Sequence, residues 1–435
     1  MEVTVTGAGL AGSEAALQLA KRKIHVNLYE MRPNKTTGAH TGKDCAEFVC
    51  SNSLGSYDKT NASGLLKHEM ELLGGELIKI AYECKVPAGS ALAIDRELFS
   101  KTVTEKIKKN PYINLIREEI TEIPDTPTII ASGPLTSNLL ADKIKEFTEN
   151  EHLHFFDAIA PIVEKDSINF DIAFYASRYD KGEASYINCP MNKEQYDKFY
   201  NILINAPRIE LKEFEKNAKF FESCLPIEVL ASRGVDTLRF GPMKPVGLID
   251  KRTGEENYAV VQLRQDNSAK TLYNLVGFQT NLKWGSQKEL LNAIPGLENA
   301  NIVRYGVMHR NTFINSPKIL NAALQTKKRS DLFFAGQITG TEGYTESIAT
   351  GLLAGINMAK YLNNEPLMEM PRETMLGALT HYISDEAHEK FQPINSNWGI
   401  LPPVDLPKKE RKNKKLKAEY MSNRSLNILQ SLSLN

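Results

Sequence analysis

A glycine-rich turn at the start of the chain has the residue types and spacing to hold a phosphate group. Gly7, Gly9 and Gly12 lie between an apolar run and an alanine-rich segment, the order expected of a strand, a tight turn and a helix. In such a turn Gly7 permits the bend, Gly9 lets the backbone approach a pyrophosphate, and Gly12 lets the helix pack closely on the strand. The helix N-terminus adds unpaired N–H groups and the positive end of the helix dipole.

A carboxylate completes this pattern. Glu30 ends the second apolar run, 24–30, eighteen residues after Gly12, where the hydroxyls of an adenosine ribose are expected. A fortuitous glycine turn is the alternative interpretation. We predict that a dinucleotide binds here and that its contacts are made by Gly7, Ala8, Gly9, Leu10, Ala11, Gly12 and Glu30.

A second glycine-rich turn lies near the other end of the chain. The apolar run 331–335 leads into a segment that contains Gly336, Gln337, Gly340 and Gly343, and a helix rich in small residues follows it. A cofactor held by both ends of the chain favours FAD over NAD, because a nicotinamide domain needs no distant closing segment. The alternative is a glycine-rich helix packed tightly on a sheet.

Two cysteines lie in contexts that suit reactive thiols. Cys50 precedes an amphipathic stretch at 64–73, and Cys224 lies two residues before Pro226, which is well placed for the first turn of a helix. A thiol just outside a helix N-terminus has its thiolate favoured by the dipole, which lowers its pKa. Either could instead be a small buried hydrophobe. That second interpretation is preferred for the remaining cysteines, Cys45, Cys84 and Cys189.

Length and composition limit the classes of protein to consider. The 435 residues predict two or three domains. Because 53 basic residues balance 53 acidic ones, any nucleic-acid contact would depend on a local basic patch. The chain has no apolar run long enough for a bilayer and begins directly with a strand, so we expect a cytoplasmic protein. Five cysteines are too few and too unevenly spaced to indicate a disulfide framework or a metal site.

These patterns predict an α/β fold, a Rossmann-like FAD-binding domain of the two-dinucleotide-fold flavoprotein type with an inserted α+β domain. The run 128–133 reads as a strand that returns the chain to the nucleotide domain, and from about Phe155 short alternating runs take over. We expect a discontinuous FAD-binding domain at 1–155 and 300–435 and an insertion for substrate or RNA at 156–299. The segment 408–417 holds seven basic residues and one acid, typical of a solvated helix face, with a phosphate-contacting patch as the alternative.

Motifs spread along nearly the whole chain carry a specific resemblance. They lie at 7–16, 28–33, 48–54, 86–93, 177–183, 188–191, 240–248, 261–266, 276–280, 305–316 and 391–393. In these stretches the chain resembles the folate- and FAD-dependent tRNA (uracil-5-)-methyltransferases, the TrmFO family. The glycine turn alone is shared with many flavoproteins, whereas the cysteine contexts and the central motifs are not.

The resemblance implies an unusual methylation. Members of the family take a methylene group from 5,10-methylenetetrahydrofolate, transfer it to C5 of the T-loop uridine at tRNA position 54, and reduce it with electrons from FAD that NADPH or NADH resupplies. Uracil C5 becomes a nucleophile only after a thiolate adds at C6, and loss of the C5 proton needs a base. This chemistry explains a requirement for cysteines.

By the family pattern, Cys224 is the nucleophile that attacks C6. Cys50 matches the cysteine nearer the flavin, which abstracts the C5 proton or protects the flavin-bound methylene. Gly336 through Gly343 match the flavin-facing segment. Four more residues are candidate folate or RNA contacts, or alternatively structural polar residues: Arg178, Lys181, His309 and Arg310.

The RNA substrate leaves alternatives open. A T-loop uridine must be unstacked before a thiol reaches it, so aromatic and basic residues are expected near the site. Available residues are Tyr273, Phe278, Lys283, Trp284 and the C-terminal lysines. A paralogue that methylates a 23S rRNA uridine by the same chemistry is the closest alternative. Two further alternatives are an FAD oxidoreductase of a small metabolite and a non-catalytic flavin-containing RNA-binding protein. The oxidoreductase is disfavoured because the sequence has no CxxC motif.

Overall fold

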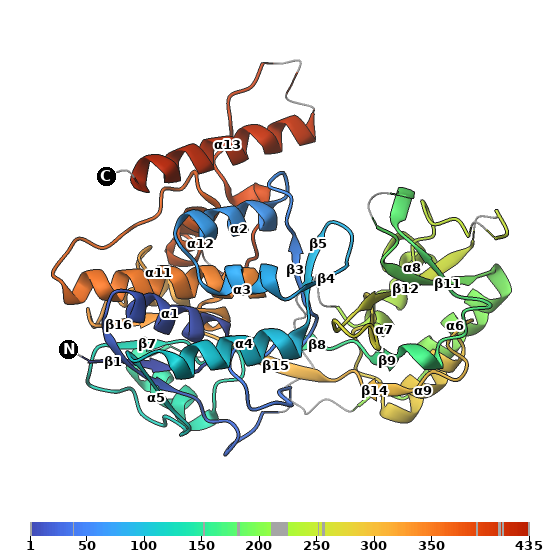
Figure 1. Ribbon diagram of the computed structural model, residues 1–435, viewed down its shortest axis with the longest axis horizontal. Coiled ribbons are helices and arrows are strands. Elements are labelled where there is room, and N and C mark those ends of the chain that lie inside the picture. Colours follow the sequence, from blue (N-terminus) through green and yellow to red (C-terminus); the bar gives the residue numbers. More distant parts are fainter. Residues whose placement is uncertain are drawn as a thin grey trace.

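The computed structural model has two lobes, one made from both ends of the chain and one from its middle (Figure 1). It describes residues 2–37, 39–150, 153–180, 183–209, 225–250, 252–254, 257–388, 390–407, 410 and 413–433. The first lobe carries blue, cyan, orange and red segments, and the second is green to yellow. The ends of the sequence therefore fold together.

A parallel five-stranded sheet forms the centre of the first lobe. Its strands, in spatial order, are β16 (Leu332–Phe334), β7 (Thr128–Ile130), β1 (Glu2–Thr6), β2 (His25–Tyr29) and β6 (Ile113–Ile116). Val3, Val5 and Leu28 are fully buried, as expected of a parallel sheet covered on both faces. β16 pairs with β7 although about two hundred residues separate them in sequence. The predicted return of the chain to the nucleotide fold is confirmed, and with it the Rossmann-like α/β class.

Two helices from opposite ends of the chain pack against each other beside this sheet. α1 (Leu10–Lys21) meets α11 (Tyr344–Leu362), and glycines allow the close approach. A Cβ on Gly351 would lie 2.2 Å from the carbonyl oxygen of Ala11, and a Cβ on Gly355 would lie 2.8 Å from that of Ala15. Only glycine fits at this spacing.

The remaining elements of the first lobe surround this centre. They are a three-stranded sheet of β3 (Ser53–Ser56), β5 (Ala91–Ile94) and β4 (Lys85–Val86), and the helices α2 (Ala62–Leu72), α3 (Leu77–Glu83), α4 (Arg96–Lys109), α5 (Asn138–Thr148), α10 (Ser316–Ile319), α12 (Met375–Ser384) and α13 (Lys414–Ser433). Glu69 of α2 joins three of these helices, because its carboxylate accepts hydrogen bonds from the backbone N–H groups of Met375 and Leu376 and from the hydroxyl of Ser425. Complete burial raises the pKa of Glu69 to about 7.

The second lobe is built on a six-stranded sheet whose neighbouring strands are antiparallel. In spatial order they are β10 (Phe174–Ala176), β11 (Tyr186–Met191), β12 (Ala259–Gln265), β13 (Leu272–Leu275), β9 (Ile162–Glu164) and β14 (Ile302–Arg304). The helices are α6 (Lys193–Asn205), α7 (Ile227–Ala231), α8 (Thr237–Phe240) and α9 (Trp284–Asn292). The sheet overlaps the predicted insertion at 156–299, whose exact limits stay a prediction.

The chain passes between the lobes along one two-stranded ladder. β8 (Leu153–Ala158) leads into the second lobe, β15 (Met308–Phe313) leads back, and the two strands pair antiparallel (Figure 1). Of the helices that the structure describes, none combines the length and the apolar composition needed to cross a membrane.

Candidate active site

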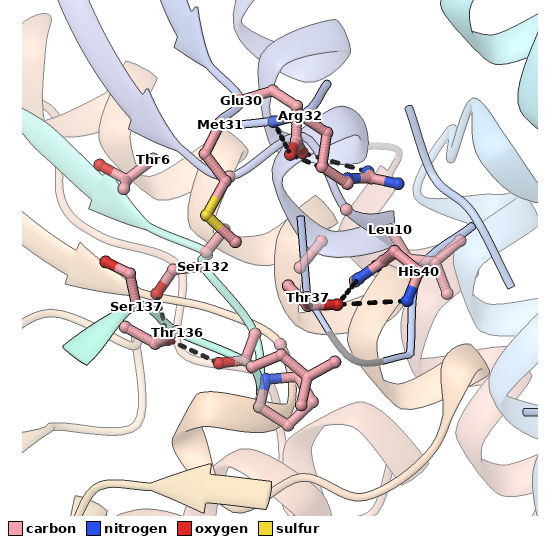
Figure 2. Close-up of a pocket in the computed structure, with 18 of the residues that line it drawn as sticks. Thr6, Leu10, Glu30, Met31, Arg32, Thr37, His40, Ser132, Thr136 and Ser137 are labelled. Atoms are coloured by element: carbon pink, nitrogen blue, oxygen red, sulfur yellow. Dashed lines mark hydrogen bonds and ion pairs between the residues drawn. The ribbon is translucent and has the colours of Figure 1, made fainter. Parts of the chain in front are cut away.

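A cavity of about 970 Å³, open to solvent, lies in the first lobe where β1 and β7 end (Figure 2). Ligands of open parallel sheets bind at this edge. Seven of the predicted cofactor residues line the cavity: Gly7, Gly9, Leu10, Ala11, Glu30, Gly336 and Gln337. The structure thus brings the two glycine-rich turns to one site.

The first glycine turn has the geometry expected of a phosphate cradle. Gly7 has φ +92°, and a Cβ on Gly12 would lie 1.8 Å from the carbonyl oxygen of Gly7. Gly9 differs, because no protein atom lies within 4 Å of its Cβ position. The space beside Gly9 is therefore open toward the cavity at the N-terminus of α1. Ala8 does not line the cavity; its backbone N–H donates to Glu30 Oε2 at 3.1 Å.

In the second glycine turn, some residues line the cavity and others only shape the backbone beside it. Gly336 has φ +82°, and its N–H donates to the Thr350 hydroxyl at 2.9 Å. Gly340 and Gly343 also have positive φ but are not among the residues that line the cavity. Gly340 packs against the ring of Phe391, and Gly343 directly precedes α11, whose first residue, Tyr344, does line the cavity.

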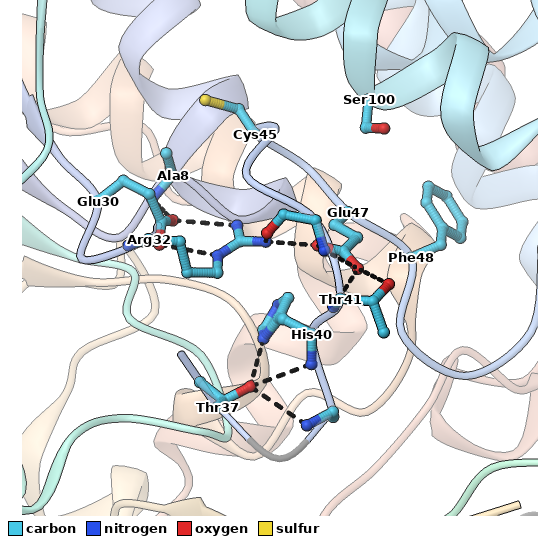
Figure 3. A network of polar contacts seen from close by, with 12 residues as sticks. Ala8, Glu30, Arg32, Thr37, His40, Thr41, Cys45, Glu47, Phe48 and Ser100 are labelled. Carbon is cyan, nitrogen blue, oxygen red and sulfur yellow. Dashed lines mark hydrogen bonds and ion pairs between the residues drawn. The ribbon is translucent and has the colours of Figure 1, made fainter. Parts of the chain in front are cut away.

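An ion-pair network fixes Glu30, the carboxylate predicted to bind the ribose hydroxyls (Figure 3). Glu30 Oε1 accepts from Arg32 Nε at 2.9 Å, and Arg32 Nη1 donates to Glu47 Oε2 at 2.6 Å. Burial would raise the pKa of Glu30, but the hydrogen bonds and charge of Arg32 outweigh it and hold that pKa below its ordinary value. The carboxylate at the cavity wall is therefore charged and rigidly oriented.

His40 is a cavity residue that the sequence reasoning missed. Its Nδ1 lies 2.7 Å from the Thr37 hydroxyl, and the ring lies near Arg32 (Figures 2 and 3). Burial and the Arg32 charge lower the pKa of His40 to about 4, so the imidazole is neutral near pH 7 and has both a donor and an acceptor. Nothing in the local sequence distinguishes this histidine from a surface one.

The residues present fit a bound dinucleotide. The Thr6 hydroxyl is buried in the cavity wall without a hydrogen-bond partner among the described residues. Buried polar groups without partners are costly, so the Thr6 hydroxyl suits contact with a polar ligand in the cavity. Two helix N-termini at the same cavity suit its phosphates.

Cys50 lies between this cavity and the second lobe. Its backbone N–H donates to the Tyr344 hydroxyl at 2.7 Å, and its Sγ donates to the carbonyl of Ala158, the last residue of β8, at 3.5 Å. Val49 and Tyr344 line the cavity. The half-buried thiol is thus placed beside the predicted cofactor site, where the two lobes meet.

Cys224 lies outside the described residues, so its place relative to Cys50 stays a prediction. Pro226 was predicted in the first turn of a helix; it is instead the N-cap of α7, one residue before the helix begins. The other cysteines, Cys45, Cys84 and Cys189, are buried as predicted. Burial also raises the pKa of the Cys189 thiol well above its ordinary value.

Of the four candidate RNA or folate contacts, the structure describes the side chain of one. Arg178 donates to the carbonyls of Lys244 and Val246, a structural use of its guanidinium. Lys181 lies outside the described residues, as do the side chains of His309 and Arg310, whose backbone belongs to β15.

Two of the aromatic residues considered for an RNA surface lie in the core instead. Tyr273 and Phe278 are 2% and 1% exposed, because they pack in the core of the second lobe. Trp284 is 60% exposed, and Lys283 beside it is exposed. In the described part of the basic run, Lys414, Lys415 and Lys417 are exposed at the start of α13, as predicted for a solvated helix face.

Comparison with known proteins extends these observations to the whole chain. The family described as Glucose inhibited division protein A (GIDA) matches residues 2–366. Methylenetetrahydrofolate--tRNA-(uracil-5-)-methyltransferase TrmFO of Bacillus subtilis (strain 168) is 58% identical over 431 residues, covering 99% of this chain and 98% of the relative. The same-named protein of Bacillus licheniformis is 57% identical with the same coverage. The crystal structure of Aquifex aeolicus GidA aligns with a TM-score of 0.70 at 17% identity, covering 100% of this chain and 74% of that one, a likeness of fold.

Proposed function

The chain belongs to the GIDA family and, within it, to the TrmFO methyltransferases, and from this premise we propose that it catalyses folate-dependent methylation of uracil C5 in tRNA. The observation that carries the proposal is the joint placement of two glycine turns and Cys50 at one site, in a chain that aligns with its relatives over nearly its full length. The methylene donor is 5,10-methylenetetrahydrofolate, as the names of the relatives indicate.

The cofactor that fits the cavity is FAD. Gly9 and the N-termini of α1 and α11 would hold its phosphates, and Glu30, which Arg32 keeps charged, would accept the ribose hydroxyls. The Thr6 hydroxyl and the neutral His40 offer further polar contacts. When bound, the flavin supplies the electrons that reduce the transferred carbon to a methyl group, and we propose NADPH or NADH as their source.

The thiols perform the activation of the pyrimidine. We propose that the Cys224 thiolate adds to C6 of the T-loop uridine at position 54, which makes C5 a carbon nucleophile. Cys50, placed beside the cavity by Tyr344 and Ala158, removes the C5 proton once C5 is bonded to the methylene carbon. The electron pair left at C5 expels the donor nitrogen from that carbon, which is then reduced to methyl. Elimination of the Cys224 sulfur from C6 then restores the ring double bond.

The assay combines the purified protein with methylenetetrahydrofolate, a reduced nicotinamide and an unmodified transcript of tRNA or of 23S rRNA. We expect 5-methyluridine in the tRNA at position 54 and none in a transcript with cytidine there. Product that depends on S-adenosylmethionine would refute the proposal, and product confined to rRNA would refute its substrate.

Three alanine variants test the thiols. Cys50→Ala and Cys224→Ala abolish product while the protein keeps its yellow colour, since neither change touches a glycine turn. Cys84→Ala is the matched control, because Cys84 is buried in the same lobe away from the cavity and has no role in transfer. Full activity of Cys50→Ala would remove Cys50 from the mechanism.

A further inference from the structure

The backbone around Cys50 is held by a buried arginine. Arg96, the first residue of α4, is 8% exposed. Its Nη1 donates to the carbonyls of Phe48 and Cys50, both at 3.2 Å. Its Nη2 and Nε contact the carboxylate of Asp266 at 2.7 to 3.1 Å. One guanidinium thus bridges the cysteine loop and an acid from another part of the chain.

That acid belongs to the second lobe. Asp266 directly follows β12, and the preceding residues of that strand contact the same loop on the other side of Cys50. Arg264 Nε donates to Asn52 Oδ1 at 3.0 Å, and Asn52 Nδ2 donates to the carbonyl of Gln265 at 2.9 Å. The Cys50 thiol itself contacts Ala158, where the chain enters the second lobe. The loop is therefore fixed largely by groups at the junction.

A buried ion pair of this kind is poorly explained by stability alone. Removing two charges from water costs about as much as their attraction returns, and apolar residues of similar volume often serve equally well. Burial lowers the pKa of Arg264, which contacts an uncharged amide oxygen. For Arg96, burial acts in the same direction but the charge of Asp266 outweighs it and raises the pKa. The pair fixes the position of the loop, because the planar guanidinium of arginine can bind a carboxylate and two carbonyls at fixed angles.

We propose that Arg96 is a positioning residue for Cys50, and that through Asp266 it makes the place of the thiol depend on how the second lobe sits against the first. The inference rests on the proposed function, in which Cys50 is a reacting group. Arg96 touches backbone on one side and Asp266 on the other, so its action on the reaction is indirect. A substrate bound between the lobes would adjust the thiol through this pair.

The test is the double variant Arg96→Gln/Asp266→Asn. It removes both charges together, so neither member of this pair is left buried without its partner. The matched control is Arg329→Gln/Asp331→Asn. Arg329 also pairs with an aspartate through two nitrogens and donates to two backbone carbonyls, those of Pro124 and Thr126, away from the cavity.

Two measurements separate positioning from general damage. We expect the Arg96 double variant to keep its FAD and to lose about 10²-fold in kcat, the cost of displacing a reacting group by roughly 1 Å, with an unchanged KM for tRNA. Alkylation of Cys50 by iodoacetamide, followed by mass spectrometry of its peptide, becomes about tenfold faster because the loop is released. The control variant changes neither quantity.

The single variants Arg96→Gln and Asp266→Asn give the coupling between the two side chains. If they act as one unit, the double variant loses no more kcat than either single variant. Wild-type kcat and wild-type alkylation in the double variant would overturn the inference, as would equal effects in the control. Absence of methyl transfer in the unmodified protein would instead count against the proposed function, while the alkylation comparison still tests the role of Arg96.

Discussion

Replacing Gly9 with alanine separates cofactor binding from folding. No protein atom lies within 4 Å of the Cβ position, and the backbone there, at φ −70°, suits alanine. Alanine is a poorer N-cap than glycine by about 0.5–1 kcal/mol, while the reduced freedom of the unfolded chain returns about 0.4–1 kcal/mol. The free energy of unfolding of the apoprotein should therefore change by less than about 0.5 kcal/mol.

The cost of the same change to FAD binding is much larger. The added methyl group occupies the space through which a phosphate would approach the N–H groups at the start of α1. Loss of one hydrogen bond to a charged phosphate costs about 1.5–3 kcal/mol, which weakens binding roughly ten- to 150-fold. Urea denaturation of the apoprotein and titration with FAD, followed by flavin fluorescence, measure the two quantities.

Gly12→Ala is the contrasting variant. Its Cβ would lie 1.8 Å from the Gly7 carbonyl oxygen, whereas ordinary contact begins at 3.4 Å. Backbone must move, at a cost of about 3 kcal/mol or more, so this variant loses stability and FAD together. If Gly9→Ala bound FAD with unchanged affinity, the cofactor would not approach this turn and our placement of it would be wrong.

Three further perturbations follow from the structure. Thr6→Val removes a hydroxyl that lacks a partner among the described residues, so the apoprotein keeps its stability while FAD binds up to about tenfold more weakly; unchanged affinity by calorimetry would contradict a contact there. Gly351→Ala places a methyl group 2.2 Å from the Ala11 carbonyl oxygen and should cost about 1–3 kcal/mol in urea denaturation, whereas Gly285→Ala, with open space around it, should cost nothing measurable. Between pH 4.5 and about 7 the folded chain keeps a proton on Glu69 that the unfolded chain releases, so stability falls as pH rises through this window. Glu69→Gln should flatten this slope in a plot of Tm against pH. An unaltered slope would show that other groups cause the pH dependence.

Local patterns predicted the nucleotide fold well. Gly7 and Gly336 lie at the ends of buried strands, and such turns depend on neighbours in sequence, so their shape can be inferred from the residues themselves. The return of the chain to the nucleotide fold at 331–336 followed from recognising the same pattern twice, and the structure adds that β16 pairs with β7 there.

The remaining parts of the site depend on partners distant in sequence. Arg96 and Asp266 are 170 positions apart, and neither has a neighbour that marks it as buried. His40 is likewise unremarkable in sequence, and its neutral state arises from burial beside Arg32. Tyr273 was a candidate for an RNA surface because an aromatic side chain serves equally in a core or against a base, and only packing decides between them.

The contact between α1 and α11 has a consequence for how the protein is made. The ribosome synthesises β7 at residues 128–130 and β16 and α11 only from residue 332 onward, so through that interval the nascent polypeptide has the edge of β7 uncovered and one wall of the cavity missing. An exposed parallel edge of this kind attracts other strands. Premature termination between residues 130 and 332 would therefore leave a product that cannot retain the flavin and is prone to aggregate.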